Sequence, residues 1–173
     1  MSRYAYWDQV LVIDDEIPDE ILNSARECVV NAGEIKEGKV LGTNPQETKY
    51  NYILDRDQKS FFLISYLESL GVVPQLEGHT TKYGVRYHVM EPGGKMTWHT
   101  DKDYSIAISV YLTDNVGGEL QVHRKDDLSQ SVMISPKRGR AVIMKCDNLH
   151  KVLEVQEGPR ESIQIFITYY NKG

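Results

Sequence analysis

The sequence predicts a mostly β protein in which two helices near the N-terminus brace a sandwich or barrel of antiparallel strands. Two stretches before Gly71 place apolar residues at helical spacing. After Gly71, short apolar runs follow one another, and turn residues separate most of them. Strands at this spacing are typical of antiparallel sandwiches and barrels. The expected order is therefore helices first and most of the strands afterwards.

The first elements can be placed from residue type. Residues 9–15 (QVLVIDD) indicate a strand. Residues 18–33 indicate the first helix, with Pro18 near its start and Gly33 past its end, as is usual for helix termini. Its apolar side chains recur at helical spacing: Ile21, Leu22, Ala25, Cys28, Val29 and Ala32.

A polar segment separates this helix from the second. Residues 34–53 are polar and contain glycines, so we expect a loop or a short hairpin. Residues 55–71 predict the second helix, with Asp57 as a candidate cap and Gly71 as its stop. We expect the apolar faces of both helices to pack against the outside of a sheet. The large side chains in these faces include Leu22, Val29, Phe62 and Leu67.

The strand-rich part is expected at residues 76–173, after a helical part at residues 1–75, and both parts belong to one domain. Turn signals such as EPGG, DNVGG, SPKRG and EGP divide it. The predicted strands are residues 82–90, 105–113, 119–123, 131–134, 140–145, 151–155 and 162–170.

Composition and charge restrict the possible classes of function. The chain has 173 residues, a net charge of -5 and two cysteines, Cys28 and Cys146. Nucleic-acid binders usually carry a basic face, so the acidic balance argues against that class. Two cysteines are too few for a disulfide framework and predict free thiols in a reducing compartment. No apolar run approaches the roughly 18 residues that span a bilayer, and the N-terminus lacks a signal-peptide pattern, so we expect a cytoplasmic protein without membrane contact.

The stretch WHTDKDYSIAISVYL, residues 98–112, contains candidate metal ligands. His99 and Asp101 are two residues apart, so in an extended backbone their side chains point to the same side. His150 follows another predicted strand. Two histidines and a carboxylate on one face of a metal form the triad of non-haem Fe(II) oxygenases, which leaves positions free for a co-substrate and dioxygen. A pair of the form His-X-Asp is also common by chance, and a structural or surface pair is the competing interpretation.

A cation follows where a dicarboxylate co-substrate would need one. Arg160 opens the last predicted strand, in GPRESIQIFITYY, ten residues after His150. Its planar guanidinium group suits a carboxylate. Ser162 would share the same face of the strand and could donate a hydrogen bond. For Arg160 alone, a surface charge after a turn is the alternative.

Four segments together resemble the prolyl 4-hydroxylase-like branch of the 2-oxoglutarate/Fe(II)-dependent dioxygenases: MTWHTDKD, SIAISVYLTDNVGGELQV, PKRGRAVIMKCDNLHKVLEV and GPRESIQIFITYY. The resemblance implies a double-stranded β-helix, a jelly roll of the cupin type. It also implies an enzyme that couples decarboxylation of 2-oxoglutarate to hydroxylation of a substrate. Its cofactors would be Fe(II), 2-oxoglutarate as co-substrate and O2, with ascorbate as a candidate reductant.

The resemblance also implies roles for individual residues. The catalytic iron ligands would be His99, Asp101 and His150. Arg160 would bind the distal carboxylate of 2-oxoglutarate, and Tyr111 would help to hold this co-substrate. Ser162 is a further candidate for the same contact.

One position departs from the resemblance. Many members of the family carry a tyrosine nine residues before the first ligand histidine, where this sequence has Met90. Either Tyr87 or His88 replaces that contact with the co-substrate, or the contact is missing.

The substrate is the part that the sequence determines least. A prolyl residue in a peptide or protein is the first candidate that the resemblance implies, and a free amino acid or small metabolite is the alternative. A non-catalytic, cupin-like barrel that binds a metal or a ligand is a third possibility. Arg160 argues against that barrel, because it would have no need of a carboxylate clamp. Residues 34–53 and 124–131 are the candidate lids, since polar loops near a site often close over it.

A few other side chains have two open interpretations. Trp98 either packs at the rim of the barrel or forms a wall of the substrate channel. His123 and Arg124 are either surface residues or contacts at the mouth of the pocket. The last group either packs a sheet or lines the approach to the active site: Tyr83, Arg86 and Tyr87.

Overall fold

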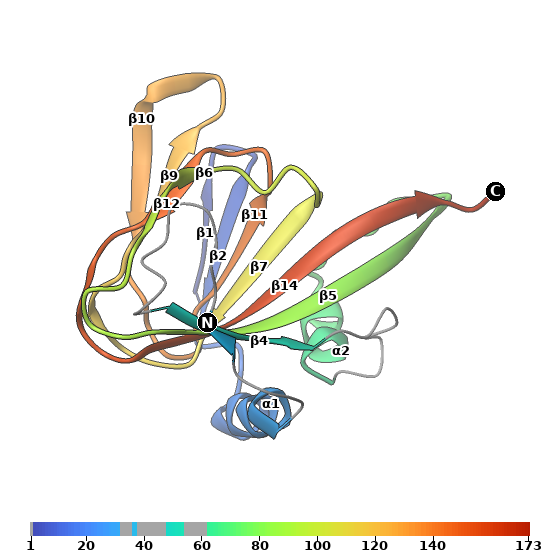
Figure 1. The fold of residues 1–173 in the computed structure, drawn as a ribbon. Helices are drawn as coiled ribbons and strands as arrows, with labels where there is room; N and C mark the ends of the chain where they lie inside the picture. The colour runs from blue at the N-terminus through green and yellow to red at the C-terminus, as the bar shows by residue number, and fades with distance from the viewer. Residues whose placement is uncertain (1, 32–35, 38–47, 54–61) are drawn as a thin grey trace.

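The computed structural model describes residues 2–31, 36–37, 48–53 and 62–173 (Figure 1). Within these residues the chain forms an eight-stranded sheet, a four-stranded sheet and a two-stranded ribbon, all with antiparallel pairing, and two helices. Both helices lie on the same side of the eight-stranded sheet. The mostly β architecture with two bracing helices is therefore confirmed.

The larger of the two main sheets, the major sheet, has the order β1-β2-β11-β7-β14-β5-β4-β3. Its strands are β1 (Ser2–Tyr6), β2 (Val10–Asp14), β11 (Ala141–Lys145), β7 (Ile106–Tyr111), β14 (Arg160–Asn171), β5 (His79–Met90), β4 (Thr48–Ile53) and β3 (Lys36–Glu37). The minor sheet comprises β10 (Asp127–Ile134), β9 (Leu120–Arg124), β12 (His150–Val152) and β6 (Met96–His99). The ribbon pairs β13 (Val155–Glu157) with β8 (Val116–Gly117). The helices are α1 (Asp19–Asn31) and α2 (Phe62–Ser69).

The N-terminal strands correct the expected division of the chain at residue 75. The expected strand near residues 9–15 is present as β2, but β1 and β2 do not stand apart from the later strands. β2 pairs with β11 and extends one edge of the major sheet, while β4 pairs with β5 and extends the other. The reason is visible in β2, where Val10 and Val12 on one face and Ile13 on the other are all buried. A strand that is apolar on both faces belongs inside a layered sheet.

Side chains alternate between the two faces of the major sheet, and this alternation creates the site. On β14, Ile163, Ile165 and Ile167 are buried in the core beneath the helices. Their neighbours Ser162, Gln164 and Phe166 point to the opposite face, toward the minor sheet. Ser162 and Gln164 therefore share one face of β14 with Arg160.

Both helices pack as expected on the outer face of the major sheet. Leu22 and Val29 of α1 and Leu67 of α2 are fully buried there, and Phe62 packs at the edge of the same cluster. α2 ends as expected, because Gly71 has a φ of 71°, a left-handed conformation that glycine adopts without strain. The expected start of this helix and its candidate cap, Asp57, lie outside the described residues.

A second core fills the space between the major and minor sheets. Val12, Val142 and Met144 contribute from the major sheet, and Leu120 and Val122 contribute from the minor sheet. Toward one end, this apolar filling gives way to polar side chains. The candidate site lies at that end.

Two expectations about the chain as a whole can be compared with the structure. Both cysteines are free thiols, as predicted, with Cys28 exposed and Cys146 buried. In the part of the chain that the structure describes, no helix is long and apolar enough to cross a membrane.

The helix packing generates a stability prediction. Leu67 is completely buried beneath the major sheet, so Leu67→Ala should lower the free energy of unfolding by about 2–5 kcal/mol through lost burial and the remaining cavity. Chemical denaturation monitored by circular dichroism measures this change. Leu76→Ala is the matched control, because Leu76 is 48% exposed and its truncation should cost far less. Equal stabilities of the two variants would show that α2 contributes little to the fold.

Candidate metal centre and co-substrate pocket

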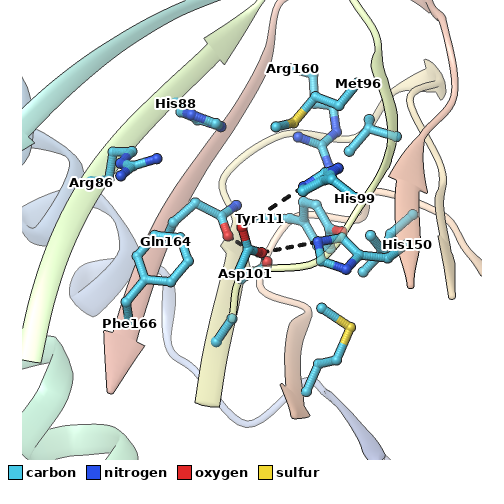
Figure 2. Close-up of a pocket in the computed structure, with 15 residues that line it drawn as sticks. Arg86, His88, Met96, His99, Asp101, Tyr111, His150, Arg160, Gln164 and Phe166 are labelled. Carbon is cyan, nitrogen blue, oxygen red and sulfur yellow. Dashed lines mark hydrogen bonds and ion pairs between the residues drawn. The ribbon is translucent and has the colours of Figure 1, made fainter. Parts of the chain in front are cut away.

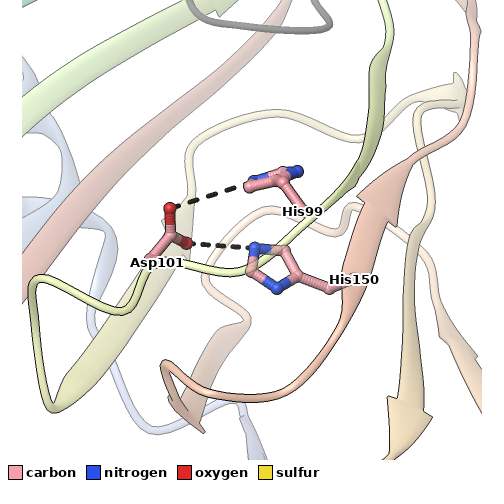
Figure 3. Close-up of side chains that lie close together, drawn as sticks. All are labelled: His99, Asp101 and His150. Atoms are coloured by element: carbon pink, nitrogen blue, oxygen red, sulfur yellow. Dashed lines mark ion pairs between the residues drawn. The ribbon is translucent and has the colours of Figure 1, made fainter.

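Three potential metal ligands converge at one end of the minor sheet (Figure 3). His99 ends β6, His150 begins β12, and the two residues are direct partners in the ladder between these strands. Asp101 follows β6 by two residues. One ligand atom from each of the three side chains lies within 4.8 Å of the others. The shortest approach is 3.1 Å, between His150 Nε2 and Asp101 Oδ2, and His99 Nε2 lies 3.9 Å from Asp101 Oδ1.

Backbone carbonyl groups orient both imidazole rings. His99 Nδ1 lies 2.7 Å from the Thr97 carbonyl oxygen, and His150 Nδ1 lies 2.8 Å from that of Asn148. Because a carbonyl oxygen can only accept, Nδ1 carries the proton in each ring, and Nε2 keeps its lone pair toward the centre of the cluster. Histidine metal ligands usually have this kind of support.

The carboxylate is held in its charged form. Burial raises the pKa of Asp101, but the proximity of His150, His99 and Arg86 outweighs burial, so the net shift is downward. Burial and the neighbouring His150 lower the pKa of His99. The Asp101 backbone N–H donates to the Cys146 carbonyl oxygen at 3.0 Å, which fixes the loop after β6. Neutral imidazoles and one carboxylate are the donor set that Fe(II) takes in facial-triad sites.

A pocket opens beside this cluster, with about 600 Å³ of empty space, part of it open to solvent (Figure 2). Arg160 lines it from the first position of β14 and is only 2% exposed. Its Nε donates to the Gly118 carbonyl oxygen at 3.0 Å, and its guanidinium carbon lies 5.1 Å from the centre of the Tyr111 ring. The guanidinium group therefore reaches the pocket as a buried and oriented cation.

A glycine gives Arg160 the room that it occupies. Gly118 has a φ of +73°, and a Cβ atom there would lie only 2.8 Å from Arg160 Cδ. Any other residue at this position would combine backbone strain with a clash. Met90, the direct partner of Arg160 in the β5–β14 ladder, contacts the guanidinium group from the other side, with its sulfur 3.6 Å from Nη1.

The part of the pocket beside Arg160 fits a carboxylate ligand. The Tyr111 side chain is fully buried, and its hydroxyl group makes no hydrogen bond of normal geometry to the described residues. Burial raises the pKa of Tyr111, while the nearby Arg160 acts in the opposite direction. A buried hydroxyl without a partner costs free energy unless a ligand supplies one. A carboxylate between Arg160 and Tyr111 would satisfy both groups.

The structure separates the other two candidates for the co-substrate contact. Ser162 is fully buried on the same face as Arg160, but its hydroxyl accepts a hydrogen bond from Gln164 Nε2 at 3.0 Å. The expectation for Tyr87 needs correction, because this side chain lies on the helix-facing side of β5, where its hydroxyl contacts Glu161. Its neighbour His88 lines the pocket instead. Burial is the main cause that lowers the pKa of His88 to about 3, so this imidazole is neutral.

Most of the side chains with open interpretations lie outside the pocket. Trp98 is 38% exposed on the outer face of the minor sheet, with its ring 4.4 Å from that of His123. Arg124 pairs with Asp126 at the surface. Tyr83 packs beneath the helices, with its hydroxyl on Glu68. Arg86, however, lines the pocket.

The structure describes one of the two candidate lids completely and the other only in part. Residues 124–131 are not a loose loop, because they form the tip of the β9–β10 hairpin, where Asp127 pairs with Arg124. Of residues 34–53, the described parts form β3 and β4, which pair with each other. The rest of that segment lies outside the described residues.

Several residues that line the pocket were not predicted from the sequence, among them Ser109, Gln164 and Phe166. Ser109 donates to Gln164 Oε1 at 2.7 Å, so the chain Ser109–Gln164–Ser162 forms a polar wall. A signal was available, since Gln164 and Phe166 continue the alternation that begins with Arg160 and Ser162.

One family model is similar to the part of the chain that carries this geometry. The sequence model of the 2OG-Fe(II) oxygenase superfamily matches residues 85–168, which include the three converging ligands and Arg160. No curated protein sequence matches the chain.

Solved structures of the same fold cover nearly the whole chain. A 2OG-Fe(II) oxygenase family oxidoreductase from Burkholderia pseudomallei has a TM-score of 0.72 at 17% identity, covering 94% of this chain and 86% of its own. A prolyl-4-hydroxylase from Pseudomonas putida has a TM-score of 0.70 at 16% identity, covering 95% and 94%. A Trichoplax adhaerens prolyl hydroxylase, solved with a peptide fragment of the hypoxia-inducible factor, has a TM-score of 0.68 at 17% identity, covering 95% and 84%.

The two main sheets therefore form the double-stranded β-helix predicted from the sequence, and its resemblance to prolyl 4-hydroxylase-like oxygenases is confirmed at the level of fold. Residues 85–168 are similar to the 2OG-Fe(II) oxygenase superfamily, whose sequence model matches them.

Proposed function

We propose that the protein is a 2-oxoglutarate- and Fe(II)-dependent oxygenase that hydroxylates an unactivated C–H bond, with a prolyl residue of a peptide or protein as the first candidate substrate. The observation that carries this proposal is one pocket that joins a convergent His-Asp-His cluster to a buried arginine. Residues 1–173 would act as one catalytic domain. The free thiols are compatible with work in the cytoplasm.

Each residue has a defined task in this proposal. His99, Asp101 and His150 would hold the iron through Nε2 and carboxylate oxygen atoms. Arg160 and Tyr111 would bind the far carboxylate of 2-oxoglutarate and so orient its keto-acid end toward the metal. When bound, iron and 2-oxoglutarate together supply the oxygen activation, and the co-substrate ends as succinate and CO2. The protein contributes ligation, orientation and exclusion of water.

Burial is the reason that Arg160 implies a dianionic co-substrate. A five-carbon diacid with one end at the metal places its other carboxylate several bonds away, in a poorly solvated region. An isolated carboxylate there would be very costly, and so would an isolated guanidinium group. Arg160 and 2-oxoglutarate remove this cost for each other.

Two alternatives have specific discriminating features. A free amino acid or small metabolite as substrate would leave the metal and co-substrate sites unchanged and would be distinguished by product analysis. A non-catalytic metal-binding barrel would have no use for the buried Arg160 or for a Tyr111 hydroxyl that has no hydrogen-bond partner among the residues that the structure describes. Incubation with Fe(II), 2-oxoglutarate and O2, followed by mass spectrometry of proline-containing peptides and free amino acids, tests the proposed reaction. Absence of both succinate and a substrate that has gained one oxygen atom would refute it.

The metal site generates the next prediction. Asp101→Ala should abolish tight Fe(II) binding, because it removes the only carboxylate of the cluster. Air-free calorimetric titration with Fe(II) measures the affinity, and circular dichroism checks the fold. Asp103→Ala is the control, since Asp103 is exposed and lies outside the cluster. Unchanged iron affinity in Asp101→Ala would rule out the proposed site.

Arg160 generates a prediction about the co-substrate. Arg160→Ala should raise the dissociation constant of 2-oxoglutarate by about two to three orders of magnitude, because loss of one partner from a buried charge pair typically costs roughly 3–5 kcal/mol. Arg160→Lys should still bind weakly, because lysine lacks the two-pronged geometry. The measurement is a titration of 2-oxoglutarate into the Fe(II)-loaded, air-free protein, with Arg124→Ala as an exposed control. Wild-type affinity in Arg160→Ala would place the clamp elsewhere.

A substitution at Gly118 tests the position of Arg160 without removing a charged group. Gly118→Ala should weaken 2-oxoglutarate binding by about tenfold or more, because the new methyl group would displace the Arg160 side chain. Iron binding should stay unchanged. Gly84→Ala is the control, since a Cβ at Gly84 meets no atom within 4 Å. If the two alanine variants bind the co-substrate equally well, the packing of Gly118 does not position Arg160.

A further inference from the structure

A single turn, residues 145–148, holds two of the three candidate metal ligands. It begins at the last residue of β11 and lies just before His150, the first residue of β12. The Cys146 carbonyl oxygen accepts the backbone N–H of Asp101 at 3.0 Å, and the Asn148 carbonyl oxygen lies 2.8 Å from His150 Nδ1. The conformation of the turn therefore helps to set where the Asp101 backbone and the His150 ring lie relative to each other.

The side chain of Asn148 ties the two ends of this turn together. Its Nδ2 group donates to the Lys145 carbonyl oxygen at 2.9 Å, and its backbone N–H donates to the same oxygen at 3.2 Å. Asparagine often makes such local hydrogen bonds to the backbone of a turn. The side-chain amide and the carbonyl group that orients His150 belong to one residue. The bond to Lys145 therefore restrains that carbonyl group as well.

Stability alone does not explain why an amide occupies this place. Asn148 is completely buried, and its Oδ1 atom has no hydrogen-bond partner among the residues that the structure describes. A buried acceptor without a partner typically costs at least as much free energy as one hydrogen bond contributes. The bond from Nδ2 to Lys145 is then balanced by the cost at Oδ1, and a role in placing the turn accounts for the residue.

His99 has a support that does not involve this turn. Its Nδ1 lies 2.7 Å from the carbonyl oxygen of Thr97, which is a residue of β6 itself. Figure 3 shows His99 and His150 reaching the cluster from separate segments of the chain. A change in the turn should therefore disturb His150 and leave the bond between His99 and Thr97 intact, so His99 is an internal reference.

We propose that Asn148 is a positioning residue of the metal centre, whose side-chain amide fixes the 145–148 turn and thereby presents Asp101 and His150 Nε2 to the metal. The inference rests on the proposed function in one respect, namely that the cluster binds a metal. Groups that hold a ligand histidine from behind fix its tautomer and direction, and their loss typically costs about 10–100-fold in metal affinity.

The first measurement needs no metal. Long-range proton–nitrogen NMR spectra of the metal-free protein, recorded where both rings are neutral, show which nitrogen of each imidazole carries the proton. In the wild-type protein, both His99 and His150 should be protonated on Nδ1. In Asn148→Ala, His150 should also populate the form protonated on Nε2, because its carbonyl partner is no longer held. His99 should keep the wild-type form.

The second measurement is the affinity for Fe(II), by air-free calorimetric titration. Asn148→Ala should bind Fe(II) about 10–100-fold more weakly than the wild-type protein. Asn148→Ser should stay within about threefold of the wild type, because a serine hydroxyl can donate to the carbonyl group three residues before it. Asp147→Ala is the matched control, since its side chain belongs to the same turn but is 43% exposed and pairs with Lys125 at the surface. It should keep the wild-type affinity and tautomers.

Chemical denaturation separates positioning from a purely structural role. Asn148→Ala should lose less stability than Leu67→Ala, because it removes a hydrogen bond and a partnerless acceptor together. Leu67→Ala should keep the wild-type affinity for Fe(II) wherever it is folded, since Leu67 lies beneath the helices, away from the pocket. A positioning role thus predicts that iron affinity and stability change in different variants.

The contrary outcomes are specific. Protonation of His150 on Nε2 in the wild-type protein would overturn the inference without any variant. Wild-type iron affinity in Asn148→Ala, or an equal loss of affinity in Asp147→Ala, would overturn it too. So would failure of Asn148→Ala to fold, because the amide would then support the fold as a whole. A wild-type protein that binds Fe(II) at this site but does not convert 2-oxoglutarate would refute the proposed function and not the role of Asn148.

Discussion

The pairing of β6 with β12 is the constraint on which the site depends. It sets His150 directly opposite His99, so two imidazole rings from distant parts of the chain share one end of the minor sheet. Asp101 reaches them because its backbone is held by the Cys146 carbonyl group at the turn after β11. The carbonyl groups of Thr97 and Asn148 then decide which nitrogen of each ring faces the centre. Backbone hydrogen bonds thus set the relative orientation of the three candidate ligands.

Side chains alternate between the two faces of the major sheet, so the residues that build the core lie on one face and the residues of the pocket lie on the other. On β14, the isoleucines at positions 163, 165 and 167 build the core under the helices, and Arg160, Gln164 and Phe166 face the pocket. The same strand can therefore be rigid on one face and polar on the other. Rigid support matters because a guanidinium group can select a carboxylate only if its position is defined beforehand.

The sequence is informative where local spacing decides the outcome. The interval between His99 and Asp101 and the place of Arg160 at the start of a strand could be interpreted without a structure, and the structure brings these residues to one pocket. The choice between Tyr87 and His88 could not be made, because a shift of one residue in register exchanges the two faces of a strand. β1 and β6 were also beyond prediction: both are short and carry polar residues among the apolar ones, and their stability comes from partners far away in the chain. Gly118 was recognisable as a turn residue, but its contact with Arg160 is a tertiary feature.

The most direct test of the account is an anomalous diffraction map from crystals grown without air in the presence of Fe(II) and 2-oxoglutarate. We expect one iron peak per chain, about 2.0–2.2 Å from His99 Nε2, His150 Nε2 and an Asp101 oxygen. We also expect no further side-chain ligand from the described residues, and 2-oxoglutarate with one end on the metal and the other on Arg160. An iron peak elsewhere, an additional protein ligand, or a co-substrate whose far carboxylate avoids Arg160 would contradict it.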